Sequence, residues 1–502
     1  RRSGSKVRLY LYGHDYKYAA EQILLTLFPA ERPEYPAGKP EGDRLEIRLS
    51  RGERFTTASC RLHIGGKRAV GRAAVKNDAL SGDLIRDRYC QRLIKNAVYR
   101  AARSYGIERP AWGALTGVRP GKLLCGILAS GVSEDEALRR FTDDYDVTEE
   151  RARLCMDTAR ETMKAAASLD KSDVCLYVGI PFCPTRCAYC SFVSQSVEKS
   201  MKLIEPFMQA LLMDISATAA EVRRLGLRVV SVYMGGGTPT TLSPAQLEAL
   251  CTALETGFDL SALREYTVEA GRPDTITAEK LRVLRAHGVD RVSVNPQTMS
   301  DGVLAAIGRR HTAADVETAL EKVRETGGFA VNMDLIAGLP TDTAEGFRDT
   351  VERVLALAPE NVTVHTLSLK KGSRITLEGA QLPTGAEVSA MLDIAREGLA
   401  SAGYSPYYLY RQKYMSGSFE NVGWAKDGYV NLYNICMMEE LCSIIAMGGG
   451  GSTKLVCSGE GRNIRIMEPK YPQEYIGGID RICAGKKKIS EFYLEDKTWH
   501  TI

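Results

Sequence analysis

From Val174 onward, short apolar runs rich in β-branched residues alternate with longer helical patterns. The apolar runs lie at 176–181, 229–234, 265–270, 291–296, 331–338 and 361–369. The helical patterns that separate them include 203–225, 244–256, 277–287, 313–326 and 344–357. Strands that alternate with helices of this length indicate βαβ units and a parallel sheet. Six such units predict a partial (β/α)6 barrel of the α/β class, short of the eight units of a closed TIM barrel.

Different patterns flank these units. Before them, short β-like runs and one helical segment are followed by a mainly helical stretch with a basic, glycine-containing loop at 113–123. After them, a helical pattern near 384–402 leads into a Tyr-rich stretch and a run of glycines. We therefore expect an N-terminal α+β domain at 1–169, the barrel at 170–375 and a C-terminal extension at 376–502. Ser243, Thr277 and Thr341 suit helix N-caps within the barrel.

Composition limits the class of protein. Of the 502 residues, 44% are hydrophobic and 25% are charged, which favours sizeable folded cores over disorder. A formal net charge of +4 is small for this length and argues against a dedicated nucleic-acid surface. No apolar stretch approaches the length of a membrane span, and the N-terminus lacks the pattern of a signal peptide. Thirteen cysteines in such a chain fit a reducing cytoplasm, where clustered thiols serve as metal ligands or catalytic groups.

Cys183, Cys187 and Cys190 form a C-x₃-C-x₂-C motif directly after the first predicted strand. Three thiolates in one short loop can bind three irons of a [4Fe–4S] cluster and leave the fourth iron without a protein ligand. That iron can chelate the amino and carboxylate groups of S-adenosylmethionine (AdoMet). A zinc site is the alternative, but it needs a fourth Cys or His nearby, and none follows before Cys251. Cys175 has no evident partner, and we interpret it as a core thiol.

A glycine loop follows the second predicted strand. Its sequence is Met234-Gly-Gly-Gly-Thr-Pro-Thr240. Residues without a Cβ let backbone amides and carbonyls approach a ligand closely, and Thr238 adds a hydroxyl. Because this loop lies one unit after the cysteine loop, we expect it to cradle the methionyl group of AdoMet. A plain turn is the alternative.

Several segments together resemble a known family. They are YVGIPFCPTRCAYCSF (177–192), YMGGGTPT (233–240), TVEAGRPDTI (267–276), SVNPQT (293–298), LAAIGRRH (304–311) and VNMDLIAGLP (331–340). These segments closely resemble the oxygen-independent coproporphyrinogen III dehydrogenase family of the radical SAM superfamily. The HemZ-like branch is the most similar, because it shares the long N-terminal region, the GRPDT phrase and the absence of a fourth cysteine after Cys190.

The resemblance implies roles for single residues. Cys183, Cys187 and Cys190 correspond to the cluster ligands. The residues assigned to AdoMet are Tyr177, Gly236, Gly237, Thr238, Glu269, Gln297, Arg309 and Asp334. Among them, Tyr177 would lie near the sulfonium and, with Glu269, would act in catalysis. Gln297 and Arg309 would form a polar pair beside the cofactor, and Asp334 would face the ribose.

The implied activity is the oxidative decarboxylation of coproporphyrinogen III to protoporphyrinogen IX in porphyrin and haem biosynthesis. The enzyme would be a cytoplasmic monomer that receives electrons from a donor such as flavodoxin or ferredoxin. Phe192 stands where the better-known bacterial branch has a further cysteine, a substitution shared with haem-chaperone relatives. The alternatives are therefore a haem-binding chaperone, with His311 and His365 as candidate axial ligands, and a radical enzyme that degrades haem or transfers methyl groups on another tetrapyrrole.

Basic residues supply candidates for binding the substrate. Arg272, Arg309, Arg310, Lys370 and Lys371 lie near predicted strand ends, where they could pair with propionate carboxylates. For most of them a solvated position is the expected state. In the N-terminal region, Arg119 and Lys122 stand beside glycines in the loop at 113–123. The alternatives for that loop are a solvated turn and a site that receives a substrate carboxylate or an acidic partner.

Overall fold

A computed structural model describes residues 6–29, 31–117, 119–190, 195–368, 380–412, 419–457 and 463–495. The chain folds into two compact units, Arg1–Met156 and Asp157–Ile502. The division falls inside helix α5 (Glu149–Ala167), and the three-part division expected from the sequence stays a prediction. None of the helices in the described ranges is both long and apolar enough to cross a membrane.

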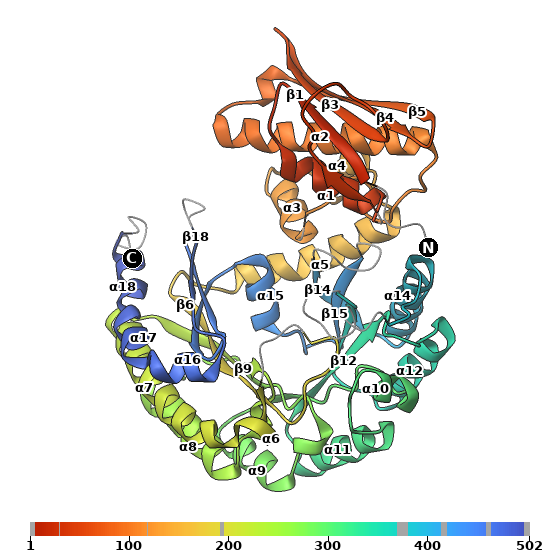
Figure 1. The fold of residues 1–502 in the computed structure, drawn as a ribbon. Helices are drawn as coiled ribbons and strands as arrows, with labels where there is room; N and C mark the ends of the chain where they lie inside the picture. Colours follow the sequence, from red (N-terminus) through yellow and green to blue (C-terminus); the bar gives the residue numbers. More distant parts are fainter. Residues whose placement is uncertain are drawn as a thin grey trace. The chain divides into compact units, whose positions relative to one another are not determined.

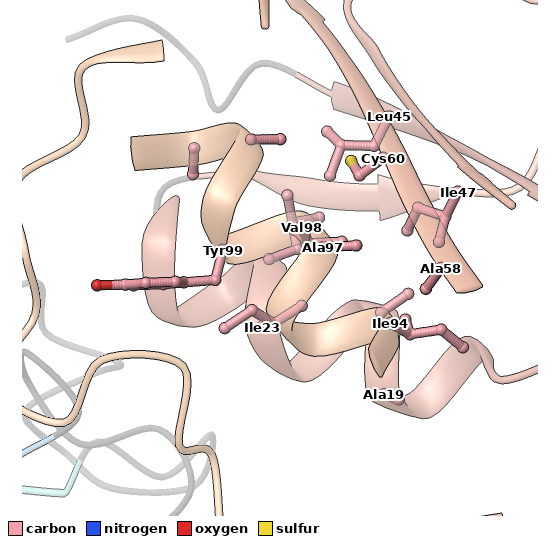
Figure 2. Packing of buried hydrophobic residues seen from close by; sticks show 14 of the residues in the cluster. Ala19, Ile23, Leu45, Ile47, Ala58, Cys60, Ile94, Ala97, Val98 and Tyr99 are labelled. Atoms are coloured by element: carbon pink, nitrogen blue, oxygen red, sulfur yellow. The ribbon is translucent and has the colours of Figure 1, made fainter. Parts of the chain in front are cut away.

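The N-terminal unit is a five-stranded sheet with helices packed on it. Its strands are β1 (Lys6–Tyr12), β2 (Arg32–Glu34), β3 (Arg44–Arg51), β4 (Phe55–Ile64) and β5 (Lys67–Lys76), in the sheet order β2-β1-β3-β4-β5. Its helices are α1 (Lys17–Leu27), α2 (Asp83–Tyr105), α3 (Pro120–Leu128) and α4 (Glu134–Tyr145). Figure 2 shows Ile23 of α1, Ile47 of β3 and Ile94 of α2 in the shared core. Helix α2 lies so close to β5 that a Cβ on Gly71 would come within 2.1 Å of the Ala97 carbonyl oxygen.

The basic loop expected at 113–123 is only partly a loop. Helix α3 begins at Pro120, and Arg119 occupies its N-cap position with Lys122 in the first turn. Proline is well suited to this place, since the first helical residue needs no hydrogen-bonded N–H. Arg119 is partly buried.

The second unit contains six parallel strands in sequence order, which confirms the expected partial barrel. They are β6 (Asp173–Ile180), β9 (Arg228–Gly236), β10 (Glu265–Val268), β11 (Arg291–Ser293), β12 (Ala330–Ala337) and β13 (Asn361–Thr366). The connecting helices form an arc outside the strands (Figure 1). They are α7 (Ile204–Arg224), α8 (Pro244–Gly257), α9 (Ala278–Ala286), α10 (Asp301–Ala306), α11 (Ala313–Thr326) and α12 (Ala344–Ala356).

Two of the three predicted helix caps are confirmed. The Ser243 hydroxyl accepts a hydrogen bond from the Gln246 N–H, and the Thr277 hydroxyl accepts one from the Lys280 N–H. The prediction for Thr341 is wrong, because α12 is capped by Thr343, whose hydroxyl accepts from the Gly346 N–H. Thr341 instead has a left-handed backbone conformation, with φ of +65°.

The C-terminal region extends the barrel sheet at both edges. Its strands are β14 (Ser405–Arg411), β15 (Glu420–Ala425), β16 (Ser443–Gly448), β17 (Ser452–Val456) and β18 (Asn463–Met467). The full order is β14-β15-β13-β12-β11-β10-β9-β6-β16-β17-β18. Strand β16 runs parallel to β6, so one edge of the first barrel strand pairs with a segment from the C-terminal region.

Further helices of this unit follow the barrel in the sequence. They are α14 (Gly385–Ser401), α15 (Leu432–Glu439), α16 (Pro472–Gly477), α17 (Ile479–Gly485) and α18 (Lys487–Glu495). Helix α14 packs on α12, and α16, α17 and α18 all contact α7. The glycine run at 448–451 lies against the end of β6, where a Cβ on Gly448 would approach the Gly179 carbonyl oxygen to 2.3 Å. This close approach accounts for the glycine at position 448.

Candidate active site

The three cysteines of the motif lie in one loop that leaves the carboxyl end of β6. Cys183 belongs to the short strand β7 (Phe182–Cys183), which pairs with β8 (Gln195–Ser196). A turn closes the other end of the motif, since the Cys190 N–H donates to the Cys187 carbonyl oxygen at 3.2 Å. All three side chains are partly exposed. Phe192 lies outside the described residues.

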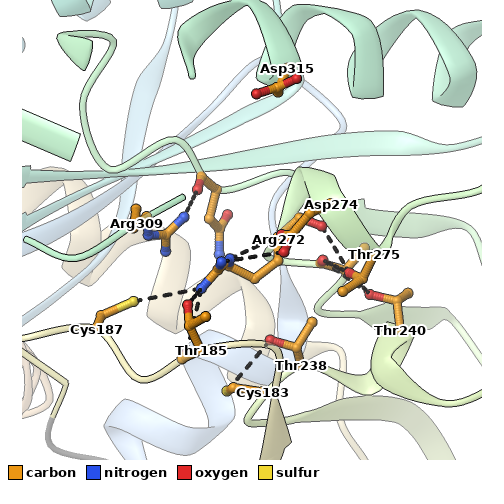
Figure 3. Close-up of polar contacts among 12 residues, drawn as sticks. Cys183, Thr185, Cys187, Thr238, Thr240, Arg272, Asp274, Thr275, Arg309 and Asp315 are labelled. Carbon is orange, nitrogen blue, oxygen red and sulfur yellow. Dashed lines mark hydrogen bonds and ion pairs between the residues drawn. The ribbon is translucent and has the colours of Figure 1, made fainter. Parts of the chain in front are cut away.

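Side chains from the next two strand ends contact this loop (Figure 3). The Thr238 hydroxyl, after β9, donates to the Cys183 sulfur at 3.6 Å. Arg272, after β10, donates to the Thr185 hydroxyl oxygen at 3.0 Å and to the Cys187 sulfur at 3.9 Å. The sulfurs of Cys183 and Cys187 therefore accept hydrogen bonds from successive barrel units, which helps to fix the loop.

Arg272 does not have the solvated position expected of it. Its side chain is 3% exposed and also pairs with Asp274 at 3.2 Å. A guanidinium buried against a sulfur ligand favours the negative charge that thiolates carry. The sequence suggested Arg272 only as a partner for substrate carboxylates. Its position directly after the Glu269-Ala-Gly segment was the available signal that it belongs to the strand-end loops.

The glycine loop is held tightly against the start of the cysteine loop. The Gly237 N–H donates to the Ile180 carbonyl oxygen at 2.7 Å, and the Thr238 N–H donates to the Phe182 carbonyl oxygen at 2.7 Å. A Cβ on Gly237 would approach that same Phe182 oxygen to 2.3 Å. A side chain at position 237 would therefore clash with the protein's own backbone. This clash explains the glycine more directly than the ligand contact that the sequence suggested.

Glu269 follows β10 and lies beside the glycine loop. Its carboxylate accepts a hydrogen bond from the Tyr233 hydroxyl at 2.6 Å and another from the Gly236 N–H. Burial raises the pKa of Glu269 from 4.5 to about 7, the nearby charge of Asp334 adds to the rise, and these hydrogen bonds oppose it. Gly235 leaves space for the group, since a Cβ there would come within 2.9 Å of a Glu269 oxygen.

Three tyrosine rings stack beside Glu269. Tyr177 and Tyr233 lie on neighbouring strands in direct register. Tyr433 of α15 stacks on both, at ring-centroid distances of 6.2 Å from Tyr177 and 4.3 Å from Tyr233. Burial raises the pKa of Tyr177 well above its ordinary value, and the charge of Glu269 adds to the rise. Tyr433 was missed by the sequence analysis because it lies outside the barrel motifs.

Hydrogen bonds to the segment after β11 link the other residues expected to bind AdoMet, which are Arg309, Gln297 and Asp334. Arg309 donates to the Asn295 carbonyl oxygen at 2.7 Å and to the Tyr189 hydroxyl oxygen at 3.1 Å. The Gln297 N–H donates to the Asp334 carbonyl oxygen at 2.9 Å. Arg309 therefore links the cysteine loop to the backbone near Gln297. Among the described residues, the side chains of Arg309 and Gln297 share no hydrogen bond.

Asp334 is held by its neighbours on β12 and β13. Burial alone would raise its pKa, but the interaction with His365 and the hydrogen bonds from Asn332 and Thr363 hold the pKa below its ordinary value. His365 lies 3.9 Å from the Asp334 carboxylate, with the Tyr410 hydroxyl 3.4 Å from its other ring nitrogen. Asp334 is thus expected to be ionised while Glu269 is close to half-protonated at neutral pH.

The other basic candidates differ in position. His311 is 4% exposed, and neither ring nitrogen has a hydrogen-bond partner among the described residues. Burial and the charges of Arg309 and Arg272 lower its pKa to about 4, which keeps the imidazole neutral. Arg310 is exposed, whereas Lys370 and Lys371 lie outside the described residues.

Cys175 has partners, contrary to the sequence analysis. It lies within β6, fully buried, and its sulfur is 3.6 Å from that of Cys442. Cys436 completes a group whose three sulfurs all lie within 4.8 Å of one another. The motif cysteines do not form such a close group, and this wider spacing suits a cluster, in which each thiolate binds a different iron.

Comparisons with known proteins agree with this geometry. A family model described as the radical SAM superfamily matches residues 177–354. The chain is 38% identical over 395 residues to the "oxygen-independent coproporphyrinogen-III oxidase-like protein HemZ" of Bacillus subtilis, which covers 77% of this chain and 78% of that protein. It is 30% identical to the "heme chaperone HemW" of the same organism over 50% of this chain and 67% of the chaperone. Among solved structures, the coproporphyrinogen III oxidase HemN of Escherichia coli matches with a TM-score of 0.49 and 22% identity, covering 64% of this chain and 72% of that one.

The family model and the similarity to HemZ define the class of protein as a radical SAM protein. Within that superfamily, the chain belongs to the oxygen-independent coproporphyrinogen-III oxidase-like family, which confirms the resemblance found in the sequence. The family implies a [4Fe–4S] cluster and AdoMet, and the residues present fit both groups. One loop carries three partly exposed cysteines, and the glycine loop leaves room beside Glu269 that a Cβ would fill.

Proposed function

We propose that this chain is a radical SAM oxidoreductase that decarboxylates coproporphyrinogen III to protoporphyrinogen IX without oxygen. The observation that carries the proposal is the convergence of the cysteine loop, the glycine loop and Glu269 at the ends of β6, β9 and β10. Similarity to HemZ over more than three quarters of both chains supports the substrate class. Barrel enzymes carry out their chemistry at this end of the strands.

The cluster would be held by Cys183, Cys187 and Cys190, and AdoMet by the glycine loop with Glu269 and Asp334. When bound, the two groups would supply one electron and a 5′-deoxyadenosyl radical able to take a β-hydrogen from a substrate propionate. Loss of carbon dioxide, with transfer of one further electron to an electron acceptor, would leave a vinyl group in place of that propionate. A donor such as flavodoxin or ferredoxin would deliver the electron that AdoMet cleavage consumes.

The chain's own residues would orient the reactants and exclude water. Glu269 can accept a hydrogen bond from an ammonium when ionised, and its raised pKa lets it hold a proton near neutral pH. The stacked rings of Tyr177, Tyr233 and Tyr433 form a rigid apolar wall next to that carboxylate. Asp334, ionised beside His365, would accept hydrogen bonds from ribose hydroxyls.

Anaerobic turnover tests the proposal. The reconstituted protein would be incubated with AdoMet, dithionite, an electron donor and coproporphyrinogen III, and the products read by mass spectrometry. We expect successive loss of two carboxyl groups, and no loss in a Cys187→Ala control. Methylated products would contradict the decarboxylase assignment in favour of methyl transfer.

A haem chaperone is the second candidate, favoured by the similarity to HemW. Its candidate axial ligands receive little support. His311 is almost fully buried, and His365 already contacts Asp334 and Tyr410. Stoichiometric transfer of added haem to an acceptor protein, without decarboxylation, would favour this function instead.

A further inference from the structure

We propose that Cys175, Cys436 and Cys442 form a second metal site, which holds one soft ion of the copper(I) class through sulfur alone. This site is separate from the proposed reaction and uses none of the motif cysteines. Cys175 comes from the middle of β6, Cys436 from α15, and Cys442 from the turn between α15 and β16.

The spacing of the sulfurs suits a single ion. All three lie within 4.8 Å of one another, and the sulfurs of Cys175 and Cys442 are 3.6 Å apart. A metal–sulfur bond of about 2.3 Å places sulfur ligands about 3.8 Å apart around a tetrahedral ion and about 4.0 Å apart around a trigonal one. Small side-chain movements would bring the group to either arrangement. A cubane needs a wider group, because each thiolate binds a separate iron.

The surroundings favour an ion that needs only three ligands. Cys175 and Cys436 are 0% exposed and Cys442 is 7% exposed, so solvent has little access. Within the described part of the chain, the group that could hold a metal here consists of these three cysteines, with no His, Asp or Glu. Zinc in a structural site is almost always four-coordinate. Soft thiolate ligands select copper(I), and three sulfurs can satisfy that ion.

Apolar side chains surround the three cysteines, so the charge of each sulfur decides the cost of burying it. Val230, Ile435, Ile444 and Tyr407 belong to the same buried hydrophobic cluster as the three cysteines. A thiolate in such a place is costly unless a cation offsets its charge. Copper(I) carries one positive charge, so the bound site would be neutral with one thiolate and two sulfurs that keep their protons. Each sulfur that becomes a thiolate ligand releases one proton as the ion binds. The result would be a crosslink between α15, the turn that precedes β16, and β6, the strand whose end carries the cysteine loop.

Metal analysis of the full-length chain tests the site. The background protein carries Cys183→Ser, Cys187→Ser and Cys190→Ser, so that neither a cluster nor the motif thiols can bind copper. It would be expressed in copper-supplemented medium, because a buried site is best loaded during folding, then purified anaerobically and challenged with bathocuproine disulfonate as a copper(I) competitor. We expect one retained equivalent of copper(I), and loss of that equivalent in each of Cys175→Ser, Cys436→Ser and Cys442→Ser.

Controls keep the outcome interpretable if a variant folds poorly. Cys251 is an equally buried thiol of the same unit, hydrogen-bonded by Tyr266, and Cys251→Ser should keep the copper. X-ray absorption on the copper-loaded background protein, with Cys175, Cys436 and Cys442 intact, should show a shell of three sulfurs and no nitrogen. The proposal is overturned if the background protein retains no copper, if it holds zinc(II) in preference to copper(I), or if copper survives Cys442→Ser. A disulfide between Cys175 and Cys442 in anaerobically purified protein, seen as a loss of two hydrogens by mass spectrometry, would also overturn it.

Discussion

Replacing Gly237 by alanine should loosen the cysteine loop as well as the ligand cradle beside it. The added Cβ would lie 2.3 Å from the Phe182 carbonyl oxygen and 2.8 Å from the Ile180 carbonyl oxygen. Both oxygens belong to backbone, so the clash cannot be relieved by turning a side chain. The same oxygens accept the 2.7 Å hydrogen bonds from the Thr238 and Gly237 N–H groups. Any movement that relieves the clash therefore lengthens these bonds.

The cost follows from these contacts. Overpacking of a filled site costs about 1–3 kcal/mol, and each hydrogen bond that opens adds about 0.5–1.5 kcal/mol. If both bonds open, Gly237→Ala should lower the free energy of unfolding by about 2–6 kcal/mol. Because Cys183 directly follows Phe182, the same movement should reduce the iron and sulfide content after anaerobic reconstitution.

Gly302→Ala is the matched control. Gly302 lies in α10, is exposed, and has no atom within 4 Å of an added Cβ. Since alanine is favoured over glycine in helices by about 1 kcal/mol, this variant should be as stable as the parent or slightly more so. Urea denaturation of the metal-free chains, followed by circular dichroism, gives the comparison. Equal unfolding free energies for the two variants would refute the reasoning.

Other predictions concern charge and chemistry at the same site. The pKa of Glu269 is higher in the folded protein than in the unfolded chain, so the folded protein binds the Glu269 proton more tightly. The stabilisation that this proton gives the fold is complete below about pH 4.5 and is lost as the pH rises through about 7. Glu269→Gln should therefore flatten this part of the curve of unfolding free energy against pH, and an unchanged slope would contradict the assignment. Cys187→Ala should prevent cluster assembly, read from iron content and the visible absorption spectrum; a normal cluster would sink the ligand assignment. Arg272→Gln should shift the cluster's reduction potential to a more negative value by removing a buried positive charge, as measured by EPR-monitored titration, whereas Arg310→Gln, at an exposed position, should leave the potential close to that of the parent. Arg119→Ala should weaken substrate binding while uncoupled AdoMet cleavage continues, and normal turnover would mean that the N-cap of α3 is purely structural.

The barrel could be predicted because its signals are local. Each of its six strands was found within a few residues of its observed position, since β-branched runs and helix caps act over short segments. Thr341 failed because capping depends on the hydroxyl's geometry at the helix start, and Thr343, two residues later, satisfies it. Strands β14 to β18 could not be ordered from sequence, because their pairing depends on contacts with distant strands.

The residues of the candidate site also divide into those that local spacing in the sequence revealed and those that only the fold brings together. Cys183, Cys187, Cys190 and the glycine loop were found because fixed spacing carries their chemistry. The grouping of Cys175 with Cys436 and Cys442 was missed, since those partners are more than 250 residues away and form no motif. Arg272 was judged by its charge alone, and only the fold shows that its side chain reaches the Cys187 sulfur.

The pairing of β6 with β16 sets an order of events during synthesis. Val174 leaves the ribosome 269 residues before its partner Ser443, a delay of roughly 10–50 s at ordinary rates of translation. Until then, the strand that leads into the cysteine loop presents an open edge, with unpaired N–H and C=O groups that invite pairing with other chains. Nascent protein consequently carries this open edge until residues 443–448 have been made.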